Sequence, residues 1–346
     1  MMKRLTVYLF KCIVAGFISL AILTLFSLVY YNPPIATPQP DLVTNYKFKE
    51  NSNWSYMLEG YGYGKTDSLG YNNAYYKDNA PTDIVFVGSS YLEAIQVPED
   101  CNFVYLLNKK FAEDNTADNN FRCFNLGISG HFFEVSASNF EHIVKKYKDA
   151  KYLVVETART EYSTEELDKI INCEYHAPLQ NGSYIRELAQ KNPYFRLMYK
   201  KINEVTSADV STAAVNTGKE LLSDNEKLKV YSDKMNEILK RISFLCAQNG
   251  VKPVILMHER FFPDALGNIT LENNETYTNA FKDCCLNNNV EIIDVVPSMI
   301  KEYKKNYAFS YGYSNGVPGE GHLNKTGHKV IAQAVYEKIN EMEEAK

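Results

Sequence analysis

Residues 83–88 read DIVFVG, a short run rich in Val and Ile with no polar face. Such a run is typical of a strand that is buried on both sides of a parallel sheet. Four further runs of this kind follow it, namely 121–126 (FRCFNL), 152–157 (YLVVET), 253–258 (PVILMH) and 290–295 (VEIIDV). Together the runs predict a central, mostly parallel sheet of about five strands.

Helical patterns separate these runs. Residues 141–148 and 228–246 place apolar side chains three and four positions apart, and a helix from about 325 to 343 closes the chain. Strands that alternate with helices predict an α/β fold, a three-layer sandwich with helices on both faces of the sheet. The interval around 163–223 is long and mostly helical in pattern, so we expect it to be an insertion within the domain.

The N-terminus carries an apolar run of twenty residues without a charge, 12–31 (CIVAGFISLAILTLFSLVYY). As a helix this run is roughly 30 Å long, which matches the hydrocarbon core of a bilayer. Lys3, Arg4 and Lys11 precede it, so the N-terminus is expected in the cytoplasm. A cleaved signal peptide is the alternative, but its apolar region is shorter, about 7–15 residues. We therefore expect residues 1–31 to form an uncleaved, single-pass anchor in the cell membrane, with the rest of the chain outside the cytoplasm.

Composition and charge divide the remaining chain. Beyond residue 31 it holds 34 basic and 42 acidic residues, an excess of acid that argues against a nucleic-acid partner. Residues 32–80 begin Pro-rich and continue Tyr-rich without periodicity, so they predict a stem and an extension that precede a main domain at 81–346. The chain has seven cysteines but no C-x-x-C motif, so we expect neither structural zinc nor another cofactor. Their disulfide pairing does not follow from the sequence.

Polar motifs follow the predicted strands, at the edge of an open α/β sheet where ligands bind. In chain order they are Gly88-Ser89-Ser90, NLGISGH (125–131), Ala158-Arg159-Thr160-Glu161, His258 and, before the last helix, GEGH (319–322). A serine nucleophile needs a neighbouring imidazole to take its proton and an acid to orient that imidazole. It also needs N–H donors where the oxyanion forms, which a glycine turn can supply. The motifs therefore predict a site for acyl transfer through a serine.

From about residue 81 to the C-terminus, these blocks resemble the SGNH/GDSL hydrolase superfamily. The resemblance makes Ser90 the counterpart of the nucleophile, and the N–H groups of Ser90 and Gly130 the donors to the oxyanion. The stretch EGHLNKTGHKVIAQAV (320–335) is similar to the last block of that family. This similarity makes His322 the catalytic base and Glu320 the acid that orients it.

The third block departs from the family pattern. That block normally supplies Gly-x-Asn-Asp, and by strand register Thr160 stands at the Asn position, so its hydroxyl is the expected third oxyanion donor. Ser89 stands where the family has Asp. We expect Ser89, His131, Arg159 and His258 as candidate pocket residues, although a packing role fits His131 and His258 better. A metal site built from the histidines is not expected, because no motif supports one.

Three functions are consistent with these residues. The resemblance implies a serine esterase that acts on an acyl ester, by analogy an O-acetyl ester, of a cell-surface glycan or on a related small ester. The alternative is an O-acyltransferase to an envelope polysaccharide, which works with a multi-pass membrane acyltransferase. The third is a non-catalytic scaffold of this fold that binds glycan or serves in assembly. A separation of about 3–4 Å between the Ser90 hydroxyl and the His322 ring distinguishes the two catalytic hypotheses from the scaffold.

Overall fold

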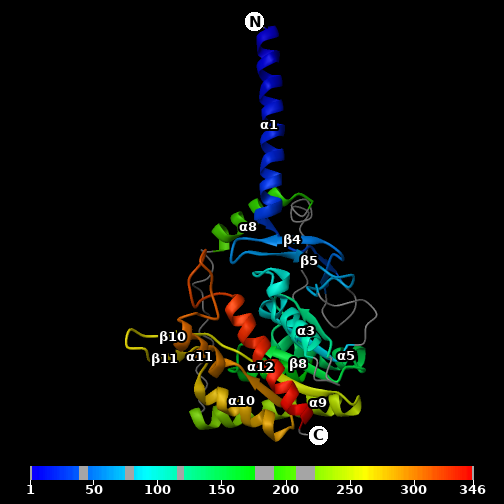
Figure 1. The fold of residues 1–346 in the computed structure, drawn as a ribbon, viewed down its shortest axis with the longest axis vertical. Coiled ribbons are helices and arrows are strands. Elements are labelled where there is room, and N and C mark those ends of the chain that lie inside the picture. Colours follow the sequence, from blue (N-terminus) through cyan, green and yellow to red (C-terminus); the bar gives the residue numbers. More distant parts are fainter. Residues whose placement is uncertain are drawn as a thin grey trace.

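The computed structural model describes residues 2–38, 46–74, 82–114, 121–175, 191–207 and 223–344 (Figure 1). Parts of the predicted stem and extension, at 39–45 and 75–80, lie outside the described residues. The same holds for 176–190 and 208–222 of the predicted insertion.

All five predicted strands form, and they make one parallel sheet. The strands are β6 (Ile84–Gly88), β7 (Cys123–Gly127), β8 (Tyr152–Thr157), β9 (Lys252–Met257) and β12 (Glu291–Asp294). They lie side by side in the order β12-β9-β8-β6-β7. Ile84 of β6 pairs in parallel register with Cys123 of β7 and with Tyr152 of β8, so the carboxyl ends of the central strands meet at one edge. The predicted α/β fold with a parallel sheet of five strands is confirmed.

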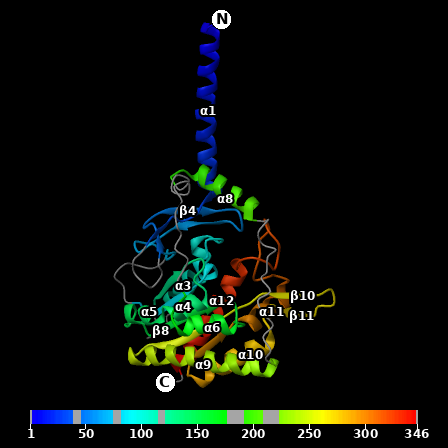
Figure 2. The same cartoon turned by 180° about the vertical axis from the view of Figure 1, so that it is seen from behind.

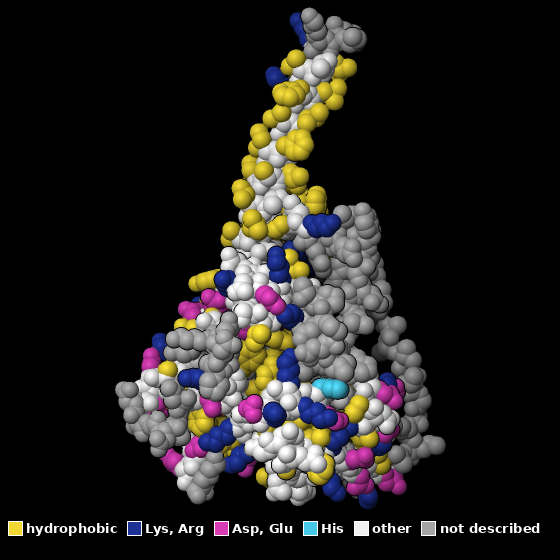
Figure 3. All heavy atoms as spheres, turned by 90° about the vertical axis from the view of Figure 1, so that its right-hand side faces the viewer, with side chains coloured by type: hydrophobic (Ala, Val, Ile, Leu, Met, Phe, Trp, Pro, Cys, Tyr) yellow, Lys and Arg dark blue, Asp and Glu magenta, His cyan; other side chains and the backbone are white. Residues whose placement is uncertain are grey.

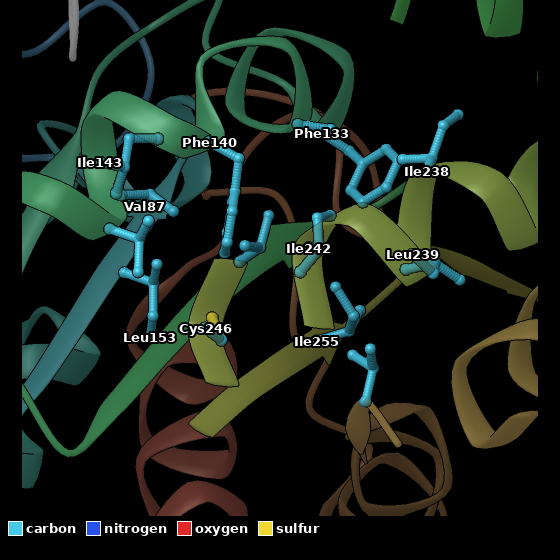
Figure 4. Close-up of a cluster of buried hydrophobic side chains, with 14 of the residues drawn as sticks. Val87, Phe133, Phe140, Ile143, Leu153, Ile238, Leu239, Ile242, Cys246 and Ile255 are labelled. Carbon is cyan, nitrogen blue, oxygen red and sulfur yellow. The ribbon is translucent and has the colours of Figure 1, made fainter. Parts of the chain in front are cut away.

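Helices cover both faces of this sheet because its strands are apolar on both sides. On β6, Val85 and Val87 face one core and Ile84 and Phe86 face the other. The first core is covered by α4 (Phe133–Ser138), α5 (Phe140–Lys146), α6 (Thr164–Ile171), α9 (Asp224–Gln248) and α10 (Glu275–Asn287). The second is covered by α3 (Phe103–Glu113), α11 (Val296–Asn306) and α12 (Lys325–Glu344). Figure 2 gives the view from behind, and Figure 4 shows the first core, where side chains of α9 meet Val87, Leu153 and Ile255 of the sheet.

A small antiparallel sheet joins the N-terminal helix to the main domain. Helix α1 (Met2–Tyr30) continues into β1 (Tyr31–Asn32), which pairs with β4 (Asn53–Tyr56), and β4 pairs with β5 (Gly62–Lys65). Strands β2 (Ala36–Pro38) and β3 (Tyr46–Phe48) form a second pair, and β10 (Phe261–Pro263) and β11 (Ile269–Leu271) a third.

The N-terminal segment shares the core of the main domain. Phe48 and Tyr71 belong to the same buried cluster as Val85, and the Tyr71 and Phe124 ring centroids lie 5.9 Å apart. Phe48 and Tyr71, from the predicted stem and extension, therefore pack against the core of the main domain.

Helix α1 projects from the globular part, and the stretch Arg4–Tyr30 is long and apolar enough to cross a membrane. Helix α8 (Pro193–Ser207) contacts the C-terminal end of α1 and is inclined to its axis (Figures 1 and 2). The seven cysteines all lie within the described residues, and each has a free thiol.

Candidate active site

Ser90 lies directly after β6, at the carboxyl edge of the sheet. It is the first residue of the short helix α2 (Ser90–Glu93), which Ser89 caps by accepting a hydrogen bond from the N–H of Tyr91. The first N–H groups of a helix have no acceptor within it. The strand-to-helix turn therefore exposes both the hydroxyl of Ser90 and a backbone donor at the same point.

His322 faces Ser90 from the loop before α12. Its Nε2 lies 3.0 Å from the Ser90 Oγ. Asn324 holds this loop, because its side-chain oxygen accepts the N–H groups of Thr326 and Gly327 at the start of α12 while its amide donates to the carbonyl of Phe309. The structure therefore brings together two residues that are 232 positions apart in the chain, as the sequence predicts.

The acid that contacts the His322 ring is Glu59, so the prediction of Glu320 as its partner is wrong. Glu59 Oε2 lies 2.7 Å from His322 Nδ1, and Glu59 Oε1 accepts the backbone N–H of His322 at 2.6 Å. Glu320 is exposed to solvent. The reason is local geometry, since Gly321 has a φ of +79° and turns the chain between Glu320 and His322.

Gly321 also makes room for Glu59. A Cβ at position 321 would lie 2.3 Å from Glu59 Oε1, so a side chain there would displace the carboxylate. On the other side, Asn315 holds the loop that carries Glu59, because its amide donates to the carbonyls of Met57 and Gly60 and its oxygen accepts the Gly60 N–H. The glycine and the asparagine together fix Glu59 against His322.

Electrostatics keep Glu59 ionised. Burial alone raises the pKa of its carboxyl, but the hydrogen bond from His322 and the charge of that ring outweigh burial, and the pKa of Glu59 is lowered. A carboxylate on Nδ1 fixes the tautomer that carries its proton on Nδ1. In the neutral form of the ring, Nε2 of His322 then carries no proton and can accept one from Ser90.

Of the three predicted oxyanion donors, the N–H groups of Ser90 and Gly130 are available, whereas the prediction of the Thr160 hydroxyl is wrong. Gly130 lies in a tight turn with a φ of +85°, and the space around its Cα is open. In the described part of the chain, the N–H groups of Ser90 and Gly130 have no acceptor. Thr160, by contrast, is 1% exposed, and its hydroxyl lies 2.8 Å from that of Thr278 in the interior. The side chain of Thr160 thus points into the core rather than toward Ser90.

Two buried polar residues support the glycine turn and the nucleophile helix. Glu93 accepts the N–H of Ser129 at 2.9 Å and also its hydroxyl, and burial raises the pKa of Glu93 to about 7. The amide of Asn125 donates to the carbonyl of Leu92, and its oxygen accepts the N–H of Gly127 at 2.7 Å. These bonds tie α2 to the turn that carries Gly130. Asn125 belongs to a block that the sequence singles out, whereas Glu93 has no such motif around it and was missed.

A hydrogen-bonded chain lies beneath the nucleophile. Glu156 Oε2 accepts both the N–H and the hydroxyl of Ser89, at 2.7 and 2.9 Å. Glu156 Oε1 lies 2.8 Å from His258 Nε2, and His258 Nδ1 lies 2.7 Å from the Tyr311 hydroxyl. The Tyr91 ring packs on the rings of His258 and His322, at centroid distances of 4.9 and 5.4 Å. The predicted pocket residues Ser89 and His258 are therefore buried supports rather than pocket walls.

A cavity of about 800 Å³ lies at the carboxyl end of β8, and its lining includes Tyr91, whose ring lies beside that of His322. Its walls include the aromatic side chains Phe132, Tyr162 and Tyr277, five carboxylates, and two basic residues, Arg159 and Lys227. Arg159 forms a bidentate ion pair with Glu166, at 2.9 and 2.8 Å. The structure thus places Arg159 in a pocket as predicted, whereas His131 is buried and does not line it. Across the described ranges, the candidate ligands His, Cys, Asp and Glu do not cluster in a way that could hold a metal ion.

Comparison with known proteins gives distant structural neighbours. No family model and no curated protein matches the chain. It is similar in structure to an acetyl xylan esterase AlAXEase (14% identity, 74% of this chain and 99% of that chain, TM-score 0.42). It is also similar to a catalytic mutant of Axe2, an acetylxylan esterase from Geobacillus stearothermophilus (12% identity, 76% and 96%, TM-score 0.40). A further similar structure is a member of the lipolytic protein G-D-S-L family from Veillonella parvula (10% identity, 74% and 97%, TM-score 0.34). At these identities, the chemistry has to be argued from the site itself.

Proposed function

We propose that this chain is a membrane-anchored serine esterase of the SGNH/GDSL type, which removes a small acyl group, by analogy acetyl, from a glycan at the cell surface. The observation that carries the proposal is the line from Ser90 Oγ through the His322 ring to Glu59, with separations of 3.0 and 2.7 Å. A scaffold that only binds glycan would not need a charged acid, an imidazole and a hydroxyl in this order.

The proposed reaction follows from the positions of these groups. The Ser90 Oγ attacks the ester carbonyl while its proton moves to His322 Nε2, and the N–H groups of Ser90 and Gly130 stabilise the oxyanion. The bond from the carbonyl carbon to the alcohol oxygen then breaks, and His322 returns the proton to that oxygen. Water attacks the acyl-enzyme by the same route and releases the acid. Glu59 holds the imidazole and stabilises its charged form throughout.

The cavity beside Tyr91 supports the proposed substrate class. Aromatic rings such as Phe132 and Tyr277 offer apolar surface to the faces of sugar rings, and carboxylates such as Glu161 accept hydrogen bonds from sugar hydroxyls. With five carboxylates against two basic residues, the walls disfavour an anionic substrate. An ester of a neutral or basic glycan fits these walls best.

A fluorophosphonate probe tests the proposal, because it reacts only with an activated serine. We expect the wild-type protein to be labelled, and Ser90→Ala to lose labelling completely. Ser314→Ala, which removes an exposed hydroxyl that is hydrogen-bonded to Tyr61, is the matched control and should label normally. Absence of labelling in the wild type, or undiminished labelling of Ser90→Ala, would overturn the proposal.

The fate of the acyl group separates hydrolysis from transfer. With an acetyl ester, an esterase turns over in water alone. An acyl-enzyme that persists in water and resolves only when glycan is added would instead favour the O-acyltransferase, with a multi-pass membrane protein as its acyl source.

A further inference from the structure

Helix α8 has an apolar face that is open to the surroundings. Phe195, Met198 and Ile202 are 48%, 41% and 56% exposed. They are spaced three and four residues apart, so they lie on one side of the helix. Exposed apolar residues scattered singly are common, but three on one helical face form a patch that is typical of a binding surface.

The opposite side of α8 holds the helix against the end of α1. Arg196 donates to the side chain of Asn32 at 2.8 Å and to the carbonyl of Pro33 at 3.2 Å. One turn later, the Lys200 ammonium lies 5.6 Å from the centre of the Tyr31 ring. Arg196 and Lys200 therefore define the side that faces the protein. The side with Phe195 and Met198 points away from it.

A hydrogen bond fixes the depth of α8 along α1. The amide of Asn192, one residue before α8 begins, donates to the Thr24 hydroxyl at 3.2 Å. Thr24 precedes the end of the uncharged run, Tyr31, by roughly 10 Å along the helix axis. At this level the side chains of Leu25 and Phe26 are 64% and 55% exposed. The start of α8 thus lies at the height of the apolar surface of α1.

Helix α8 contacts α1, so the exposed apolar face of α8 lies near the apolar surface of α1, and basic side chains flank both. Figure 3 shows hydrophobic side chains along α1, with Lys and Arg side chains where the helix meets the globular part. Helix α8 itself carries two lysines, the half-buried Lys200 and the exposed Lys201. Basic residues beside an apolar helix face match the headgroup region of an anionic membrane.

We infer that α8 lies in the membrane interface, with Phe195, Met198 and Ile202 inserted into the lipid of the leaflet that α1 leaves. This inference rests on the proposed membrane anchor and goes beyond the proposed chemistry. It makes the membrane surface a second attachment site. The globular domain is then held at a fixed angle to the bilayer instead of moving freely on a single helix.

Tryptophan reporters in full-length protein, reconstituted into vesicles with brominated lipids, test this position. Trp54 is the only native tryptophan and is 3% exposed, so the parent protein gives the baseline. Three aromatic replacements place the reporters: Phe17→Trp on α1, Phe195→Trp on α8 and Phe244→Trp on α9. Phe17 and Phe244 are 70% and 60% exposed, and α9 lies at the end of the molecule opposite α1. Met198→Trp is a second α8 reporter, in case Phe195→Trp disturbs the fold.

The expected result is selective quenching. Lipids brominated near the top of the acyl chains should remove roughly half of the added fluorescence of Phe195→Trp or Met198→Trp, since an interfacial helix buries its apolar face about 5–10 Å deep. Lipids brominated in mid-chain should quench the α1 reporter, and neither lipid should quench the α9 reporter. Quenching of the α1 reporter, with both α8 reporters as insensitive as the α9 reporter, overturns the inference and leaves the anchor intact. Quenching of none of them overturns both the inference and the anchor, while probe labelling of Ser90 reports on the chemistry separately.

Discussion

Glu59 makes two contacts with one residue, and both bear on the reactivity of Ser90. Its Oε2 accepts a hydrogen bond from His322 Nδ1, and its Oε1 accepts one from the backbone N–H of the same residue. The first contact sets the tautomer and stabilises the imidazolium that forms when Ser90 gives up its proton. The second fixes the position of the backbone that carries the ring. A single carboxylate thus fixes both the tautomer and the position of the base.

Replacing this carboxylate gives the sharpest test of the revised triad. Glu59→Gln keeps the size of the side chain but removes the charge, so we expect kcat for an acetyl ester to fall by about 10³–10⁴-fold, as when the acid of a serine triad is made neutral. Glu320→Gln is the matched control and should stay close to wild type, because Glu320 is exposed. Steady-state kinetics at one pH is sufficient. If Glu320→Gln fell further than Glu59→Gln, the original sequence prediction would be restored.

Glu93 links stability to pH near neutrality. Burial raises the pKa of its carboxyl from 4.5 to about 7, so the folded protein keeps a proton that the unfolded chain has released. This contribution to stability is fully present below about pH 4.5 and is lost as the pH rises through about 7. Between these values the free energy of unfolding should fall by about 3 kcal/mol relative to Glu93→Gln, which has no proton to release. Denaturant unfolding in detergent at about pH 5 and about pH 8 measures this, and parallel pH curves for the two proteins would contradict it.

At the level of elements, the central sheet could be predicted from local sequence patterns, but the active site only in part. The five strands could be predicted because a strand buried on both faces is apolar at every position, a signal confined to a few consecutive residues. Ser90 and His322 could be placed because each lies in a motif beside such a strand or helix. Glu59 could not, since it lies in an aperiodic Tyr- and Gly-rich loop, 263 residues from His322. Glu156 could not be predicted either, because it lies within a strand whose other residues are mostly apolar.

One signal for Glu59 was present in the sequence. Gly321 precedes the histidine at a position where neither a helix cap nor a strand explains a glycine. In the structure it has a positive φ and lies against Glu59. A glycine at such a position indicates close approach of another group. It does not indicate which group, so the identity of the acid needed the folded chain.

The loop that carries Glu59 depends on Asn315 for its position, which leads to a prediction for this element. Asn315→Ala removes three hydrogen bonds to Met57 and Gly60, each worth about 0.5–1.5 kcal/mol. We expect kcat to fall about tenfold with little change in KM, because the acid is displaced while the cavity is untouched. Asn306→Ala, which removes a hydrogen bond to Glu302 on the surface, is the control and should have wild-type kcat. Equal kinetics for the two variants would show that the loop with Glu59 keeps its position without Asn315.

In the whole molecule, hydrogen bonds connect the proposed anchor to the segment that carries the proposed acid. The Ser55 hydroxyl donates to the carbonyl of Leu28, and the N–H of Met57 donates to the carbonyl of Tyr30, the last residue of α1. Glu59 follows two residues later. Strands β4 and β5 lie between α1 and the central sheet (Figure 1). The sheet next to α1 thus carries the loop that positions Glu59 against His322.

The proposed topology, with the N-terminus in the cytoplasm and the globular domain outside, predicts which thiol is accessible from which side. Cys173 is exposed in the globular part, and Cys12 lies in the apolar helix. Burial and the neighbouring Asp100 raise the pKa of Cys101, so its thiol reacts more slowly at neutral pH. The remaining cysteines are buried.

A membrane-impermeant maleimide should therefore label right-side-out vesicles mainly at Cys173. Inside-out vesicles should stay unlabelled until detergent is added, because the domain is then enclosed in the lumen. Cys173→Ser should remove most of the label and show that the signal comes from this site. Labelling of intact inside-out vesicles would reverse the topology and place the site on the cytoplasmic face. A cell-surface glycan could then no longer be its substrate, although the arrangement of Ser90, His322 and Glu59 would still support an esterase.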